Sequence, residues 1–146
     1  MPGALHDDQL LIRTADTHLY FKKSNEERLY HFAFNIPTNK MELCHSWLKE
    51  RTTLLPFEGE EIIRHENWKS DAIYAFDSSK NIIEFIARPT AIEAEGPDYF
   101  DPTEDVLNVS EIGMVHESIP HVHEKVKAAG IERYFGEDEY FSAFGT

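Results

Sequence analysis

A repeated pattern, in which a short strand is followed by a helix, constrains the fold of this chain more than any other feature. Segments 31–36 and 111–116 are compact and apolar, as expected for strands, and each precedes a segment with apolar residues at helical spacing. Their first residues, His31 and Glu111, are 80 positions apart. We therefore predict an α+β fold in which one strand–helix unit occurs twice.

Local signals indicate where the two helices begin and end. Asn39, with Glu42 three residues later, forms a variant of the capping box before a run of apolar residues at helical spacing. In the second repeat, Ser118 is the expected cap, Pro120 lies in the first turn, and Gly130 ends the helix. Each predicted helix has an apolar face that can pack on a sheet.

The order of these patterns divides a single predicted domain into four parts. Residues 9–23 contain two short strand-like runs and predict a hairpin, and residues 29–88 predict a complete strand–helix–three-strand module. Residues 89–107 hold three prolines and a cluster of acids, which predicts an irregular acidic linker. Residues 108–144 repeat the opening of the module and predict an incomplete second copy.

Composition narrows the class of partners. The 27 acidic and 14 basic residues give a formal net charge of -13, which repels nucleic-acid phosphates and anionic membrane surfaces. No segment approaches the roughly 20 consecutive apolar residues of a membrane span, and the N-terminus lacks the pattern of a signal peptide. We expect a cytoplasmic protein that binds neither nucleic acid nor membranes.

Two common types of site have no support in the sequence. Cys44 is the single cysteine, which excludes an internal disulfide and a CxxC metal or redox motif. It lies among apolar residues at helical spacing, so we expect a buried, inert thiol. The seven glycines are scattered and form no phosphate-binding loop, so a nucleotide cofactor is not expected.

Glu84 stands between Ile83 and Phe85 in a segment that predicts a strand, and two arrangements are open for it. If Glu84 points inward, its carboxylate is costly to bury unless it is paired or coordinated. If the strand is half-exposed, Glu84 points outward while Ile83 and Phe85 enter the core. Spacing alone favours the second arrangement.

His31 and Glu111 are also open to two interpretations. A histidine at a strand start is commonly a hydrogen-bonded structural residue, and Glu111 could be a solvated entry to its strand. Taken with Glu84, however, they place ligand-type side chains at corresponding points of two repeated strands and on the strand that closes the first module. Three aromatic residues nearby, Trp68, Tyr74 and Phe76, either line a substrate pocket or belong to the core.

Three runs of sequence resemble the vicinal oxygen chelate superfamily, which includes glyoxalase I, fosfomycin and bleomycin resistance proteins and extradiol dioxygenases. They are YHFAFNIP at 30–37, AIYAFDSSKNIIEFIAR at 72–88 and SEIGMV at 110–115. The resemblance covers 29–88 as a whole module and about 108–144 as a partial one. It implies repeated βαβββ modules whose curved mixed sheets surround a pocket.

The resemblance also implies chemistry. Metal ligands of the family fall on His31, Glu84 and Glu111, and this nitrogen and oxygen set suits a divalent Mn, Fe, Ni, Co or Zn ion. Glu111 would then serve as the general base of a metal-dependent lyase or dioxygenase acting on a small oxygen-rich molecule. The alternative is a non-catalytic protein of the same fold that binds and sequesters a small molecule.

Two departures from the family pattern favour the binding alternative. The turn before Glu84 reads DSSKN at 77–81, which keeps the terminal Asp and Asn of the family motif but not its Pro and Gly. The second module stops before its last strand, so the fourth ligand has no counterpart. Because an incomplete sheet leaves unpaired edges, we expect a homodimer, in which strands can be exchanged between copies.

Overall fold

The computed structural model divides into two compact units, residues 1–114 and 115–146, which are considered separately here. The structure describes residues 3–6, 8–26, 28–91, 93–135 and 142–144. The first unit contains β1 (Gly3–His6), β2 (Gln9–Arg13), β3 (His18–Lys22), β4 (Tyr30–Ile36), the 3-10 helix η1 (Thr38–Lys40), α1 (Met41–Lys49), β5 (Ile63–His65), β6 (Ser70–Phe76), β7 (Ile82–Ala87) and β8 (Asn108–Met114). The second contains α2 (Ile119–Ala128), β9 (Arg133–Phe135) and β10 (Ala143–Phe144).

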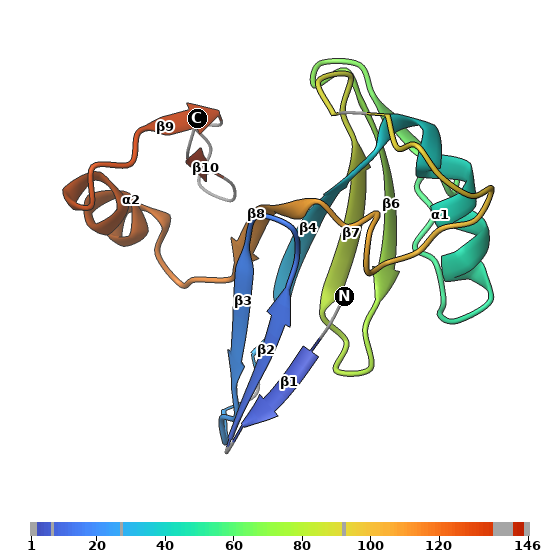
Figure 1. The fold of residues 1–146 in the computed structure, drawn as a ribbon. Coiled ribbons are helices and arrows are strands. Elements are labelled where there is room, and N and C mark those ends of the chain that lie inside the picture. Colours follow the sequence, from blue (N-terminus) through green and yellow to red (C-terminus); the bar gives the residue numbers. More distant parts are fainter. Residues whose placement is uncertain (1–2, 7, 27, 92, 136–141, 145–146) are drawn as a thin grey trace. The chain divides into compact units, whose positions relative to one another are not determined.

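A five-stranded mixed sheet with the order β5-β6-β7-β4-β8 organises the first unit (Figure 1). β4 runs parallel to β7, and the other neighbouring strands are antiparallel. The elements β4, α1, β5, β6 and β7 follow the predicted strand–helix–three-strand order. The α+β class is therefore confirmed, and β8 joins the same sheet beside β4.

A second sheet in this unit is formed by β1, β2 and β3, which pair antiparallel in that order. β2 and β3 lie within the segment predicted as a hairpin, and β1 is a strand that the sequence analysis did not predict. Leu19 of β3 is buried in the main core, and the ring of Phe21 meets Phe32 of β4 edge to face at 5.1 Å. The N-terminal strands thus contribute to the same core as the larger sheet.

The core lies between α1 and one face of the five-stranded sheet. Side chains alternate along a strand, so every second residue of the central strands points toward α1. The buried members are Leu19, Phe32, Phe34, Ile36, Met41, Cys44, Leu48, Leu54, Ile73, Ala75, Phe85, Ala87, Phe100 and Val106. Cys44 is buried as predicted, and burial raises the pKa of its thiol, which keeps the sulfur protonated and unreactive.

The predicted capping box at Asn39 and Glu42 is wrong. The chain enters α1 through η1, and Lys40 occupies the N-cap position without a side-chain capping bond. Asn39 instead exchanges two hydrogen bonds of 3.0 Å with the backbone of Ala94. A long-range contact thus takes the side chain that the local pattern assigned to the start of the helix.

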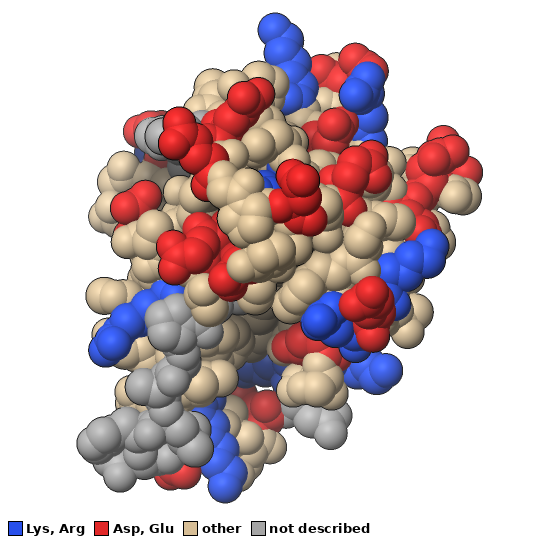
Figure 2. All heavy atoms as spheres, turned by 45° about the vertical axis from the view of Figure 1, so that its right-hand side comes forward, with Lys and Arg blue, Asp and Glu red and all other residues tan. Residues whose placement is uncertain are grey.

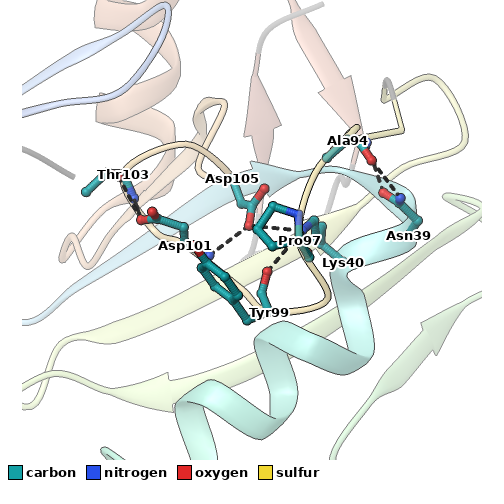
Figure 3. Close-up of polar contacts among 8 residues, drawn as sticks. All are labelled: Asn39, Lys40, Ala94, Pro97, Tyr99, Asp101, Thr103 and Asp105. Carbon is teal, nitrogen blue, oxygen red and sulfur yellow. Dashed lines mark hydrogen bonds and ion pairs between the residues drawn. The ribbon is translucent and has the colours of Figure 1, made fainter.

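Lys40 is buried, with 3% of its surface exposed, although it carries an ammonium group. Its Nζ donates to the carbonyl oxygens of Pro97 at 2.7 Å and Tyr99 at 2.9 Å, and lies 3.7 Å from Oδ2 of Asp105 (Figure 3). Asp105 also accepts a 2.8 Å hydrogen bond from the backbone N–H of Asp101. The buried cation therefore has two hydrogen-bond acceptors and a neighbouring negative charge, which offset the cost of its desolvation.

These contacts fix the segment predicted as an irregular acidic linker, 89–107, to the start of α1. The described residues of the segment form no helix or strand, yet Phe100 and Val106 are buried in the main core. The ring of Phe100 lies 5.5 Å from that of Trp47 on α1 and 6.0 Å from that of Phe85 on β7. The segment is an integral part of the first unit.

The strand that opens the second repeat begins and ends earlier than predicted, because β8 spans Asn108–Met114 rather than 111–116. The helix signals are confirmed: Ser118 caps α2 by accepting a 3.4 Å bond from the N–H of His121, and Gly130 has φ +77° after the helix. β9 and β10 pair antiparallel in a two-stranded sheet. Neither described helix is long and apolar enough to cross a membrane.

Replacing Lys40 by Met should lower the free energy of unfolding by about 3–5 kcal/mol, because Asp105 and two carbonyl groups lose their buried partner. The control is Lys49→Met, since the Lys49 side chain is 59% exposed and solvent weakens its ion pair with Glu61. Chemical denaturation measures both values. Equal effects of the two substitutions would contradict the assigned role of Lys40.

Candidate functional site

A row of side chains crosses the face of the five-stranded sheet opposite α1. The strand register aligns Tyr74 of β6 with Glu84 of β7, Glu84 with Ala33 of β4, and Ala33 with Glu111 of β8. Cross-strand partners point to the same face, so two carboxylates flank a buried alanine. Ala33 itself is fully buried and packs with Ala72 and Ile86 on this face.

His31 and Glu84 form the centre of this row. Nε2 of His31 donates to Oε2 of Glu84 over 2.8 Å. Glu84 is 4% exposed, whereas about a third of the His31 side chain, 32%, reaches solvent. The buried carboxylate is therefore paired with a group that solutes can reach.

Gly113 of β8 supports the position of His31, which is its partner across the strand pair. A Cβ atom at residue 113 would lie 3.0 Å from Cβ and 3.3 Å from Nδ1 of His31. Contacts that close require the neighbour to move. Glycine at this position thus allows the imidazole to lie over β8 while it bonds to Glu84.

The outcome for Glu84 combines features of both predicted arrangements. Ile83 and Phe85 pack in the main core, so Glu84 does point to the opposite face, as spacing favoured. The carboxylate is nevertheless buried, because Tyr74 and His31 lie beside it. Strand alternation predicted the direction of the side chain but not its surroundings.

Tyr74 links this centre to His65 of β5. Its hydroxyl lies 3.2 Å from Nε2 of His65, and its ring lies 6.0 Å from that of His31. Burial raises the pKa of Tyr74 far above its usual range, and the negative charge of Glu84 and a hydrogen bond to it act in the same direction. Tyr74 is therefore a neutral hydrogen-bonding group.

Arg88 forms a second polar group with β4 and β8. Its Nη2 donates to Oε1 of Glu111 at 2.5 Å and to Oγ of Ser110 at 3.1 Å, and its Nε donates to Oδ1 of Asn35 at 3.3 Å. Asn35 in turn donates to Oδ1 of Asn108 over 2.7 Å. The carboxylate of Glu111 is thus neutralised by a guanidinium.

Sequence reasoning missed Arg88, although a signal was present. Arg88 follows Glu84 by four residues, and the even spacing along an extended segment places both on the same face. Its partner Glu111 lies 23 residues further along the chain. Only the pairing of β8 with β4 brings that carboxylate within reach.

The residues expected to hold a metal fit that role unequally. His31 and Glu84 are close enough to share an ion, whereas Glu111 is engaged by Arg88. Within the part of the chain that the structure describes, no three His, Cys, Asp or Glu side chains are grouped so that they could hold a metal ion. A three-ligand site would require Glu111 to exchange Arg88 for the metal.

The three aromatic residues predicted for a substrate pocket have different positions. Tyr74 lies in the polar row, and Phe76, two residues further along β6, has the ammonium of Lys80 5.7 Å from its ring centre. Trp68 lies in the turn between β5 and β6, and its backbone N–H donates to the carbonyl oxygen of His65. Of the three, Tyr74 is the one placed beside His31 and Glu84.

Comparison with protein-family models gives no match, and comparison with curated proteins gives none either. The arrangement of polar groups on the sheet is therefore the basis for assigning a function.

Replacing Tyr74 by Phe should reduce the loss of stability at alkaline pH. In the unfolded chain Tyr74 ionises near pH 10, whereas in the folded protein its pKa is raised, so the folded state binds more protons above that pH. The free energy of unfolding of the wild type should therefore fall as the pH rises beyond about 10. Denaturation at neutral and alkaline pH measures this, and an equally steep fall in the variant would contradict the burial of Tyr74.

Proposed function

We propose that this chain binds a small oxygen-rich molecule on the sheet face that carries His31, Glu84 and Arg88, and that it does so without catalysis. The observation that carries the proposal is the pairing of buried Glu84 with partly exposed His31. An imidazole oriented by a buried carboxylate offers a fixed hydrogen-bonding group to a ligand. Tyr74 and Arg88 supply further groups on the same face.

The state of Glu111 favours binding over catalysis. A general base must be free to accept a proton, but the Glu111 carboxylate is held by Arg88 at 2.5 Å. The order of β4, α1, β5, β6 and β7 along the chain agrees with the strand–helix–three-strand module that the resemblance to vicinal oxygen chelate proteins implies. The proposed activity corresponds to that of the sequestering members of that superfamily.

NMR titration with small compounds bearing oxygens on adjacent carbons, among them catechol and glycolate, tests this proposal. We expect at least one compound to give saturable shifts at β4, β7 and β8. Glu84→Gln should weaken its binding about tenfold, because a charge-assisted hydrogen bond to His31 is lost. Glu42→Gln is the matched control, since Glu42 is exposed on α1 and outside the row.

Arg88→Lys provides a second test that keeps the charge of the site. Lysine lacks the planar fork that bonds Ser110, Glu111 and Asn35 together, so the network should loosen and ligand affinity should fall. Thermal unfolding of each variant separates this effect from a loss of fold. The proposal is overturned if no compound perturbs the row, or if Glu42→Gln weakens binding as much as Glu84→Gln.

A metal-dependent lyase or dioxygenase is the second candidate, favoured by the 2.8 Å contact between two ligand-type groups, His31 and Glu84. These two residues would bind the ion. Glu111 would become a third ligand if its ion pair with Arg88 were broken. A bound divalent ion would supply Lewis-acid chemistry to a substrate with adjacent oxygens. Tag-free protein should then bind one equivalent of Mn, Fe, Co, Ni or Zn in calorimetry.

The His31→Ala, Glu84→Gln double variant distinguishes this candidate from the first. Loss of the metal equivalent in that variant would support a metal centre, and unchanged binding would place the ion elsewhere. A wild-type protein that binds none of these ions but does bind an oxygen-rich compound would leave the first proposal standing alone.

The expected homodimer is a further part of the proposal. β8 and β5 lie at the two edges of the five-stranded sheet, and Ile112 on β8 is 51% exposed. An edge strand can pair with a second copy through its unpaired backbone groups. Light scattering should give twice the mass of one chain, and a monomer at all concentrations would refute dimerisation.

A further inference from the structure

The hydrogen bonds of the proposed ligand face have a defined direction, which is set by Glu84. An ionised carboxylate can only accept hydrogen bonds. The two groups that bond to Glu84 must therefore donate: Nε2 of His31 over 2.8 Å, and the hydroxyl of Tyr74, in a bond that raises the pKa of the tyrosine. In a neutral His31 imidazole, the ring hydrogen is thus on Nε2.

The second ring nitrogen of His31, Nδ1, is left as an acceptor, because a neutral imidazole carries one ring hydrogen. No group of the described residues donates to Nδ1, and Nδ1 is not one of their buried polar atoms that lack a partner, so solvent reaches it. The ring edge that carries Nδ1 lies beside Gly113, which has no side chain to cover it. A ligand on this face therefore meets an acceptor at His31.

Donor groups beside His31 are directed into the protein. Tyr74 gives its hydroxyl hydrogen to Glu84, so its oxygen can only accept from Nε2 of His65, which lies 3.2 Å away. Arg88 uses Nε and Nη2 in hydrogen bonds to side chains of β4 and β8. A ligand that only accepts hydrogen bonds is therefore poorly matched to this face.

The charges of the face oppose an anionic ligand. Glu84 and Glu111 bring two negative charges, and Arg88 brings one positive charge that is paired with Glu111. Acidic side chains are also spread over the side of the molecule shown in Figure 2, in a chain of net charge -13. Because like charges repel, the face favours a neutral ligand over a carboxylate.

An apolar side chain lies next to His31 on the same face. The strand register pairs His31 with Ile82 of β7, and Ile82 with Phe76 of β6. Ile82 is 36% exposed. The hydrocarbon part of a ligand can cover this surface and remove it from water.

We propose that the ligand of this face is a neutral hydroxyl compound, which donates a hydrogen bond to Nδ1 of His31 and packs its hydrocarbon part on Ile82. This inference rests on the proposed function, because it names the class of the oxygen-rich molecule. A hydroxyl supplies the hydrogen that Nδ1 accepts, whereas an ether or a carboxylate supplies none.

The experiment is an NMR titration of the whole chain, with a metal chelator present, at about pH 8, where an unperturbed imidazole is neutral. The probes are the vicinal diol of cyclohexane, its dimethyl ether and glycolate. The diol should give saturable shifts at β4, β7 and β8, and the ether, which keeps both oxygens but has no hydroxyl hydrogen, should bind about tenfold more weakly. Glycolate should also bind more weakly than the diol.

The ring nitrogens of His31 provide a readout that a purely structural role would not change. In protein labelled with nitrogen-15, binding of the diol should shift the Nδ1 resonance, while the hydrogen stays on Nε2. His31→Gln keeps a donor that can reach Glu84 but has no acceptor in place of Nδ1, so it should weaken diol binding about tenfold. His18→Gln is the matched control, since His18 is exposed on β3, and it should leave diol affinity unchanged.

The outcomes separate this inference from the proposed function. If the ether or glycolate binds to the face as tightly as the diol, or if Nδ1 carries a hydrogen in the complex, the ligand class is wrong and the proposed function stands. If His18→Gln weakens diol binding as much as His31→Gln, the role of Nδ1 is wrong. If no compound with adjacent oxygens perturbs the face, both proposals are overturned.

Discussion

The buried ammonium group of Lys40 is the constraint on which the first unit depends. Its Nζ donates hydrogen bonds to the backbone carbonyls of Pro97 and Tyr99 and lies beside Asp105. These contacts attach the segment 89–107, which follows β7, to the start of α1. From there the chain leads directly into β8, which pairs antiparallel with β4. An isolated buried charge would be too costly to keep, so the lysine and its partners are ordered together.

The position of β8 has a direct effect on the polar face. β8 contributes Glu111 and Gly113, one as the partner of Arg88 and the other as the residue that makes room for the His31 imidazole. The opposite faces of β4 and β7 meet α1 and are apolar. One sheet therefore separates the main core from a face on which polar side chains lie around a small apolar cluster of Ala33, Ala72 and Ile86.

Charge compensation explains how acidic residues persist on this surface in a chain of net charge -13. Glu84 is paired with His31, and Glu111 with Arg88, so both carboxylates have cationic or hydrogen-bonding partners. Buried or partly buried carboxylates are stabilised by such partners.

The sequence by itself determined the features that depend on neighbouring residues. Alternation predicted that Glu84 faces away from Ile83 and Phe85, and the signals at Ser118 and Gly130 correctly placed the ends of α2. These features rest on backbone geometry within a few residues, which the local order of side chains specifies.

Only the tertiary structure decided the partners of the charged residues. Asn39 was predicted to cap a helix but bonds to Ala94, 55 residues away, and Lys40 reaches Pro97 across 57. Glu111 was predicted as a metal ligand and lies against Arg88. Such pairs form because a polar group that is removed from water is stable only with a hydrogen-bonding or charged partner. Which partner lies near enough depends on the folded chain and not on spacing in the sequence.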